Sequence, residues 1–476
     1  MDDRVISICR AVRDAGGRAM LVGGWVRDHF AGIESKDYDI EVYGVESRRL
    51  RSILEKIARV NTVGESFTVY KLTFDSIPAP PSRKPITAEG RIEIDVSVPR
   101  RESKSGRGHR GFTVEGDPSM SFEDAALRRD FTINSILYDP LDDQTIDPFS
   151  GLADLDRRIL RVVSADTFIE DSLRVLRGMQ LSARYELAID SATAQLCRGI
   201  DLSDLPHERI WGEFEKLLTL AKRPSIGLAT ALEFGVLDKL FAEIRALAGC
   251  HQDAEEHPEG DAFEHTKLCL DIATNLAGSL SHAQRITLLL AVICHDLGKP
   301  LTTTVTAGRV TFPNHDAAGV EPARSVLDRL GLHTLGGYDV RSRVLELVRE
   351  HLQPSRLYAE REKITDGAIR RVSREVAPRL LCLLARADGL ARGPASSDDA
   401  AEWLIDKFRS LGVEEGPPEP ILMGRHLLEA GFPPGPEMGE LIRRVYELQL
   451  DGEVRDVEQG LAAAQRLAQS DQLERA

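Results

Sequence analysis

The sequence predicts an α+β protein in which strands lie in the N-terminal third of the chain and helices form the rest. Residues 37–42 and 91–98 alternate between polar and apolar side chains, which is the pattern of half-buried strands. From residue 151 to residue 235 the pattern becomes helical. The segment from Ile286 to Cys294 is strongly apolar and is followed closely by Gly and Pro, which are helix-stop signals.

Composition and charge limit the class of protein. The chain has 476 residues, of which 42% are hydrophobic and 29% charged, as expected for a soluble globular protein of two to four domains. The start of the chain lacks a secretory pattern, and its apolar segments are too short to span a bilayer, so we expect no membrane association. The six scattered cysteines predict reduced thiols and a cytoplasmic location. A net charge of −15 argues against a general nucleic-acid binder.

The first motif lies in residues 20–43. An apolar run ends at Gly23 and Gly24, a helix-like stretch follows, and a strand then carries Asp37 and Asp39. Residues two apart on a strand point to the same side, so these carboxylates would repel each other unless a cation sat between them. Mg²⁺ with substrate phosphates suits such a pair, and the glycines allow close approach of a triphosphate near a helix N-terminus. Separately, each feature is more often a turn or a solvated strand edge.

The order and spacing of these features resemble the signature of the class II tRNA nucleotidyltransferase and bacterial poly(A) polymerase family. Trp25 departs from the family, which usually has a small residue there. The resemblance implies a mixed-sheet nucleotidyltransferase head followed by an all-helical neck. It further implies that Asp37 and Asp39 hold Mg²⁺, and that Gly23, Gly24 and Arg27 bind the nucleotide.

A second predicted strand, residues 91–98, supplies Asp95 as a candidate third carboxylate. Such a residue could accept the proton of a 3′-hydroxyl or hold the second of two metals, and the family has a carboxylate with this role here. The alternative is an acidic residue at a sheet edge. The basic stretch 99–110 follows, and it is either a solvated loop or a mobile loop beside a polyphosphate or RNA backbone.

Residues 122–139 open like a helix and resemble the family's Arg-Arg-Asp-x-x-x-Asn element. The resemblance implies that Arg129, Asp130 and Asn134 contact the triphosphate and ribose of a nucleotide. Guanidinium groups bind phosphate bidentately, so the arginine is chemically suited to this role.

Residues 170–185 are predicted to form a helix on which Glu170, Asp171 and Arg174 face one way, three and four residues apart. They resemble the Glu-Asp-x-x-Arg element by which the family reads the Watson–Crick edge of CTP or ATP. The alternative is a surface ion-pair helix. Arg177 matches a further nucleotide-contacting arginine. The chain departs from the family three and four residues after Arg177, where Gln180 replaces an arginine and Leu181 replaces a phenylalanine.

A third set of residues is typical of a metal centre, because imidazole and carboxylate groups together bind divalent metals. The candidate ligands are His265, His295, Asp296, His315, His351 and Asp388. A single histidine near a core is usually structural. This set, in a helical pattern, resembles the HD-domain phosphohydrolase superfamily. The resemblance implies a transition metal (Mn²⁺, Fe²⁺, Co²⁺ or Ni²⁺) and hydrolysis of phosphoesters such as 2′,3′-cyclic phosphates.

We therefore expect a head over residues 1–150, a neck over 151–240, an HD domain over 241–412 and a helical tail over 413–476. The expected reaction adds CMP and AMP from CTP and ATP to the 3′ end of tRNA. Alternatives are a poly(A) polymerase, an enzyme that adds only A or only CC, and an HD phosphohydrolase whose head only binds RNA. The segment 63–67 lacks the basic pair of poly(A) polymerases, which favours tRNA. The oligomeric state stays open.

Overall fold

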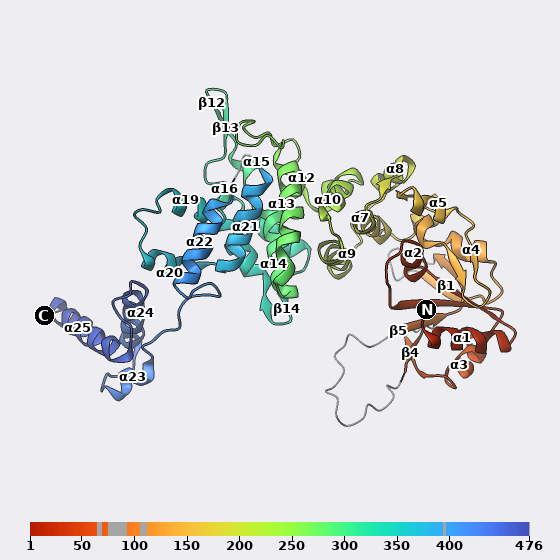
Figure 1. The fold of residues 1–476 in the computed structure, drawn as a ribbon, viewed down its shortest axis with the longest axis horizontal. Coiled ribbons are helices and arrows are strands. Elements are labelled where there is room, and N and C mark those ends of the chain that lie inside the picture. The colour runs from red at the N-terminus through yellow and green to blue at the C-terminus, as the bar shows by residue number, and fades with distance from the viewer. Residues whose placement is uncertain (64–68, 75–92, 105–111, 394–396, 476) are drawn as a thin grey trace. The chain divides into compact units, whose positions relative to one another are not determined.

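The computed structural model describes the chain except residues 64–68, 75–92, 105–111, 394–396 and 476 (Figure 1). It divides into two compact units. The first contains Met1–Glu213 and Ala229–Lys239, and the second contains Phe214–Leu228 and Leu240–Ala476. A seven-stranded sheet lies in the first unit and the second unit is mainly helical, which confirms the α+β prediction.

The sheet of the first unit has the order β3-β4-β5-β2-β1-β8-β9. Its strands are β1 (Arg18–Val22), β2 (Asp37–Tyr43), β3 (Arg59–Val63), β4 (Val69–Thr73), β5 (Glu93–Ser97), β8 (Leu137–Asp139) and β9 (Gln144–Ile146). β2 and β5 run parallel, whereas the other neighbouring pairs are antiparallel, so the sheet is mixed.

Side-chain alternation in β2 separates the two faces of the sheet. Tyr38, Ile40 and Val42 are buried in a core that also includes residues of α1 (Asp3–Asp14), α2 (Gly24–Phe30) and α3 (Ser47–Leu54). Asp37 and Asp39 point to the opposite face, as predicted for residues two apart on a strand. The apolar face thus anchors the strand and leaves the acidic face available for chemistry.

Some elements end earlier than the sequence pattern predicts. Residues 4–20 have the pattern of an amphipathic helix, but α1 ends at Asp14, because Gly16 has a φ of +84° and turns the chain into β1. Residues 47–60 have a helical pattern as well, but α3 ends at Leu54, and β3 follows. In the basic stretch, Arg100–Lys104 forms β6, which pairs with β7 (Phe112–Gly116), while residues 105–111 lie outside the described part.

Helices complete the first unit. They are α4 (Phe122–Leu127), α5 (Gly151–Asp156), α6 (Ala165–Phe168), α7 (Leu173–Tyr185) and α8 (Ser191–Gly199), with the 3₁₀ turn η2 (Thr132–Asn134). α9 (His207–Leu220), α10 (Pro224–Glu233) and α11 (Val236–Leu240) follow, and the segment Phe214–Leu228 within them belongs to the second unit. The short strands β10 (Ile159–Leu160) and β11 (Ala188–Ile189) pair in parallel.

The second unit is built around α14 (His282–Cys294), whose apolar residues from Ile286 to Cys294 are all buried. α13 (Ala262–Leu276), α18 (Val340–Glu350) and α21 (Pro378–Ala391) pack against it (Figure 1). The unit also contains α12 (Ala242–Arg245), α15 (Lys299–Thr302), α16 (His315–Ala318), α17 (Val320–Arg329), α19 (Gln353–Ala359), α20 (Asp366–Glu375) and α22 (Asp399–Ser410). Two hairpins, β12 (Thr304–Thr306) with β13 (Arg309–Thr311) and β14 (Thr334–Leu335) with β15 (Tyr338–Asp339), interrupt the helices.

The C-terminal helices have a small core of their own. α23 (Gly424–Glu429), α24 (Pro436–Leu450) and α25 (Val457–Arg475) bury Leu427, Val445 and Ala464 together. The four domain boundaries expected from the sequence stay a prediction. Among the helices that the structure describes, none is long and apolar enough to cross a membrane.

Close packing of α5 on η2 supplies a test of the fold. A Cβ on Gly151 would lie 2.1 Å from the carbonyl oxygen of Thr132, whereas a Cβ on Gly199 would meet nothing within 4 Å. We expect Gly151→Ala to destabilise the first unit by about 1–3 kcal/mol, because backbone atoms cannot move aside cheaply. Each kcal/mol lowers the melting temperature by about 2–4 °C in a unit of this size. Calorimetry should show this shift and none for the control, Gly199→Ala; equal melting temperatures would contradict the packing.

Candidate active sites

The register between β2 and β5 places two predicted carboxylates side by side. Asp39 is the direct neighbour of Asp95, and Asp37 and Glu41 flank Asp39 on the same face. One oxygen of Asp95, Oδ1, is buried and has no hydrogen-bond partner among the described residues. The other, Oδ2, lies 3.3 Å from the Nζ of Lys71 on β4. The sheet therefore gathers the three carboxylates that the sequence predicted, although they come from segments far apart in the chain.

A cavity of about 260 Å³ opens over this pair of carboxylates. Its lining includes the acidic residues Asp39, Glu41 and Asp95 and the basic residues Arg100, Arg128, Arg129 and Arg174. Arg129 donates to Glu41 at 2.6 Å. A wall rich in guanidinium groups facing a floor of carboxylates can hold a polyphosphate together with a divalent cation.

Burial and the neighbouring charges act in opposite directions on the carboxyl group of Asp39. Solvent reaches the residue through the open mouth, but the surrounding protein atoms still desolvate the carboxyl group and raise its pKa. Arg129 lowers that pKa, and the neighbouring carboxylates of Asp95, Asp37 and Glu41 raise it further. The net shift is upward, so a bound cation would relieve unfavourable charge at this position.

Gly23 brings the backbone close to these groups. Its φ is +68°, a conformation that glycine adopts without a steric cost, and a Cβ at this position would lie 3.5 Å from both Asp39 and Arg129. Gly24 begins α2 directly afterwards. The predicted glycine pair therefore lies beside the carboxylates.

Arg27 is occupied inside the protein rather than exposed to a ligand. Its side chain is 6% exposed, and it donates to Asp28 at 2.8 Å, to Asn134 at 2.7 Å and to the hydroxyl of Tyr185. Asn134 in turn donates to Asp130 at 2.9 Å, and Asp130 accepts from the Phe131 backbone. These contacts give Arg27 a structural role, and its direct binding of the triphosphate stays a prediction.

Arg177 continues this chain of contacts to α7. Its Nε lies 2.9 Å from Oδ2 of Asp130. Burial alone would raise the pKa of Asp130, but Arg177 and the hydrogen bonds from Asn134 and Phe131 lower it. The network therefore ties α2, η2 and α7 together through charges that compensate one another.

The predicted base-reading residues are arranged differently from the helical face expected. α7 begins at Leu173, so Glu170 and Asp171 precede the helix, and an i, i+4 face cannot align them with Arg174. The backbone N–H of Arg174 donates to the Asp171 carbonyl at 3.0 Å, which makes a turn before the helix. The Arg174 guanidinium donates to the carbonyls of Thr167 (2.6 Å) and Arg128 (2.9 Å) at the cavity wall.

The two departures from the family pattern also have definite places. Gln180 is 5% exposed, and its Oε1 has no hydrogen-bond partner in the described part of the chain. Trp25 is 6% exposed and stacks on Tyr38 and His29. Trp25 is therefore a core residue, and the unsatisfied Gln180 amide marks a remodelled position on α7.

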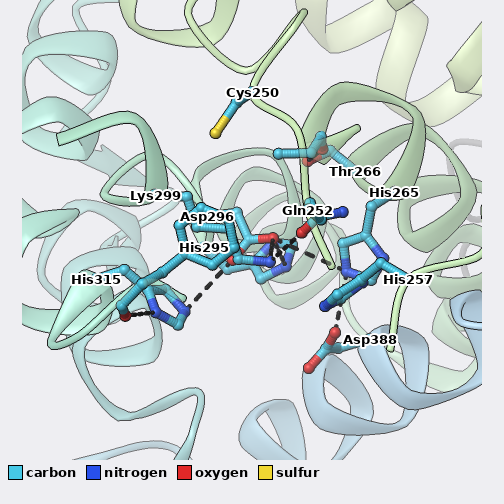
Figure 2. A network of polar contacts seen from close by, with 12 residues as sticks. Cys250, Gln252, His257, His265, Thr266, His295, Asp296, Lys299, His315 and Asp388 are labelled. Atoms are coloured by element: carbon cyan, nitrogen blue, oxygen red, sulfur yellow. Dashed lines mark hydrogen bonds and ion pairs between the residues drawn. The ribbon is translucent and has the colours of Figure 1, made fainter. Parts of the chain in front are cut away.

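The second unit contains the other predicted constellation, and all six residues lie in one cluster, in which Asp388 is half-buried and the others are buried. Figure 2 labels all of them except His351. Asp296, His315 and His351 form one group whose ligand atoms lie within 4.8 Å of one another, and His265, His295 and Asp388 form another together with Cys269. His265 is 3.9 Å from Asp296, which links the two groups. Figure 2 shows His315 on one side of Asp296 and His265 on the other.

Hydrogen bonds fix the ring orientation of the histidines. The Nδ1 atoms of His295, His315 and His351 each lie 2.7–2.8 Å from the backbone carbonyl three residues earlier. This leaves each Nε2 to face the cluster, the arrangement in which a second ring atom orients a metal-binding imidazole. Nδ1 of His265 lies 2.6 Å from Glu259, which also contacts His257 at 2.8 Å.

The charge states of Asp296 and His351 suit a metal, whereas a metal would have to displace a proton from His265. Burial alone would lower the pKa of His265, but Cys269, Asp388 and Glu259 raise it well above its usual range. Burial would raise the pKa of Asp296, but His295 and Lys299 hold it well below its usual range. Burial lowers the pKa of His351 to about 4, so this imidazole is neutral near pH 7. Metal ligation requires ionised carboxylates and neutral imidazoles.

Each site passes a simple test of whether its residues fit a metal. In the second unit, Oδ2 of Asp296 already lies 2.7 Å from Nζ of Lys299 and 3.2 Å from Nε2 of His295, so the fit there rests on the donor set. In the first unit, Asp95 Oδ1 is buried and has no hydrogen-bond partner among the described residues. Such atoms are costly unless something binds them. The donor sets differ, because the first is carboxylate alone and the second contains imidazole.

Several residues of these sites were missed by the sequence reasoning. Lys71 contacts Asp95 only because β4 and β5 pair, which no local pattern shows. Glu259 and Lys299 each lie within a few residues of a candidate histidine in the sequence. Their contacts with buried ligand candidates cannot be recognised before the fold is known. Cys269 lies one helical turn after His265, and this spacing could have identified it.

Comparison with known proteins now adds to this geometry. Residues 19–161 match the family model of the poly A polymerase head domain, and residues 262–393 match that of the HD domain. A multifunctional CCA protein of Xanthomonas campestris pv. campestris is 32% identical over 444 residues, covering 92% of both chains. The chain belongs to the multifunctional CCA protein family. This confirms the two resemblances drawn from the sequence and makes the chain a nucleotidyltransferase with an HD domain.

Further relatives agree with this family. A multifunctional CCA protein of Haemophilus influenzae is 37% identical over 320 residues, covering 65% of this chain and 70% of that protein. The fold resembles the Bacillus stearothermophilus CCA-adding enzyme in complex with CTP (TM-score 0.63, 20% identity, 99% and 100% coverage). It also resembles the Thermotoga maritima CCA-adding enzyme in complex with tRNA (TM-score 0.60, 18% identity, 98% and 95% coverage).

The buried network around Arg27 yields a prediction that separates positioning from direct triphosphate binding. We expect Arg27→Leu to destabilise the first unit by about 3–5 kcal/mol, because Asp28, which is 2% exposed, would lose its closest charged partner. Thermal unfolding should show this loss, and the control Arg51→Leu, on an exposed surface pair with Glu55, should change little. A stable Arg27→Leu protein whose only defect is weak triphosphate binding would contradict the structural role.

Proposed function

We propose that the first unit adds CMP and AMP from CTP and ATP to the 3′ end of tRNA and so builds or repairs the CCA terminus. The observation that carries this proposal is the pairing of Asp39 with Asp95 across parallel strands, on the floor of a cavity with four arginines. The relatives' names and the substrates bound to the similar structures support this choice of substrates.

The residues of the cavity divide the chemistry among them. Asp37 and Asp39 would hold Mg²⁺, which neutralises charge on the triphosphate and makes the 3′-hydroxyl more acidic when bound. Arg129 would bind triphosphate oxygens, with the Gly23 and Gly24 backbone alongside. Asp95 would accept the proton of the 3′-hydroxyl. The 3′-oxygen of the tRNA would then attack the α-phosphorus of the nucleotide, and pyrophosphate would leave.

We also propose that Glu170, Asp171 and Arg174 select the base. Arg174 supports this by its place on the cavity wall, where two backbone carbonyls hold its guanidinium in a defined orientation. Asp130, Asn134 and Arg177 would act from behind, because they join the wall of α7 to η2. A site built to hydrogen-bond one base edge rejects another base because buried groups are then left unpaired.

The experiment that tests the activity uses tRNA transcripts ending before A, before CA and before CCA, each incubated with one nucleotide triphosphate at a time. The proposal predicts addition of C, C and A in order and no long poly(A) product. Addition of A alone or CC alone would favour the partial enzymes. The segment 63–67 that favoured tRNA over poly(A) lies mostly outside the described residues, so this assay is needed to decide the matter.

For the second unit we propose metal-dependent hydrolysis of phosphoesters, with 2′,3′-cyclic phosphates as the first substrates to test. Support comes from the six ligand candidates, their oriented imidazoles and their ionised carboxylates. A transition metal (Mn²⁺, Fe²⁺, Co²⁺ or Ni²⁺) suits the imidazole ligands, whereas Mg²⁺ suits the carboxylates of the first unit. The six cysteines are free thiols, which supports a location in a reducing compartment such as the cytoplasm.

Removing the carboxylate at the centre of the first site should abolish nucleotide addition. We expect Asp39→Ala to lower the rate of CTP incorporation into tRNA by at least about 100-fold, because charge on the triphosphate loses its counter-ion. The matched control is Asp142→Ala, which removes a half-exposed carboxylate from the same unit. Incorporation by Asp39→Ala within tenfold of the unaltered protein would overturn the assignment.

Metal preference should separate the two activities. Asp296→Ala should lose bound transition metal, measured by plasma mass spectrometry, and lose hydrolysis of 2′,3′-cyclic AMP, while nucleotide addition with Mg²⁺ continues. Asp406→Ala, an exposed change in the same unit, should keep both. If the unaltered protein binds no transition metal and hydrolyses nothing above the Asp296→Ala level, the cluster is structural.

A further inference from the structure

The cluster of the second unit lies at a cavity of about 210 Å³ that contains more than metal-ligand candidates. Its lining includes Asp296, His315, His351 and Asp388, the aromatic ring of Phe312, and two cations, Lys299 and Arg392. A phosphoester entering this cavity would meet acidic groups that repel it unless a metal or a cation intervenes. The two cations are therefore the candidates for binding the substrate.

Lys299 is already committed to the protein. It is 4% exposed, and its Nζ lies 2.7 Å from Asp296 and donates to the Gln252 side chain at 2.6 Å. Its ammonium also lies over the ring of Phe312, 5.3 Å from the ring centre. These contacts stabilise the ionised Asp296 and leave little of the ammonium for a ligand.

Arg392 is committed only in part. Its Nη2 donates to the two carboxylate oxygens of Asp388, at 3.1 and 3.0 Å. Its Nε is buried and has no hydrogen-bond acceptor among the described residues, although the side chain as a whole is 36% exposed. A buried donor without an acceptor is unfavourable, so its persistence at a cavity calls for an explanation.

The chemistry of the unused donors indicates the ligand. A guanidinium carries five N–H donors in a plane, and this fork matches two oxygens of a phosphate better than an ammonium does. Because Arg392 already contacts Asp388, an oxyanion on its free donors would lie next to the proposed metal ligands. That is where a phosphoryl group must sit to be attacked.

We infer that Arg392 binds the phosphate of the second unit's substrate, a role that neither the sequence motifs nor the family match assigns. The inference rests on the phosphohydrolase function proposed above. It applies to phosphate monoesters and to cyclic phosphodiesters alike, because both present phosphoryl oxygens to the guanidinium.

The test measures binding of inorganic phosphate by titration calorimetry to the full chain loaded with Mn²⁺. Arg392→Ala is compared with the unaltered protein and with Arg386→Ala, a control on the same helix whose Nε lies 2.7 Å from Asp398. Phosphate sites in the first unit are the same in all three proteins, so a difference reports on the second unit. Arg392→Ala should weaken this binding at least tenfold, Arg392→Lys should weaken it less, and Arg386→Ala should leave it unchanged.

Metal content, measured in the same samples, distinguishes ligand binding from support of Asp388. Unchanged metal with weakened phosphate binding supports the inference. Parallel loss of metal in Arg392→Ala and its retention in Arg392→Lys with normal phosphate binding would show that Arg392 only holds Asp388, and unchanged binding in Arg392→Ala would likewise overturn the inference.

Hydrolysis of 2′,3′-cyclic AMP and of a nucleoside monophosphate, assayed separately, tests the proposed function itself. Phosphate binding that depends on Arg392 without any hydrolysis would support this residue's role while removing the enzymatic one. A higher KM for one substrate alone in Arg392→Ala would identify which phosphoester the guanidinium binds.

Discussion

The parallel register of β2 against β5 is the constraint on which the first site depends. It places Asp39 next to Asp95, and a slip of one residue would turn a carboxylate toward the core and the side chain of Ile40 away from it. Two adjacent carboxylates are unfavourable alone, and the carboxylates of Asp95, Asp37 and Glu41 add to the desolvation that raises the pKa of Asp39. Arg129 and Lys71 offset part of that repulsion, so the surrounding cations and a bound metal complete a charge arrangement that the sheet imposes.

The second unit solves a similar electrostatic problem with different residues. The helix α14, which is buried from Ile286 to Cys294, carries His295 and Asp296 into the interior directly after its last turn. Burying such charges is costly unless they are paired, and Lys299 and Arg392 provide the pairing. Each carboxylate thus has a cation on one side and imidazoles on the other, which is a stable arrangement before any ligand arrives.

The sequence predicted those parts of the sites that depend on local periodicity. Alternation in one strand was enough to place Asp37 and Asp39 on one face, and the apolar helix was enough to bury His295 and Asp296. The family resemblance suggested Asp95 as their partner, and the register of β2 against β5 places it there. Features that depend on distant pairing were missed or misjudged. The contact of Lys71 with Asp95 requires knowledge of strand order, and Arg27 is buried because α7 supplies Tyr185. The expected face of Glu170 and Arg174 failed because the helix begins at Leu173, a boundary that periodicity defines poorly.

Crystallography can test directly whether Asp37 and Asp39 hold the metal of the first site. Crystals of the full chain soaked with Mn²⁺ and CTP would show the metal by its anomalous scattering. We predict a manganese peak next to the carboxylates of Asp37 and Asp39. Asp95 should face the ribose, and triphosphate oxygens should contact Arg129. Manganese absent from this strand pair, with the CTP phosphates bound elsewhere in the chain, would contradict this prediction.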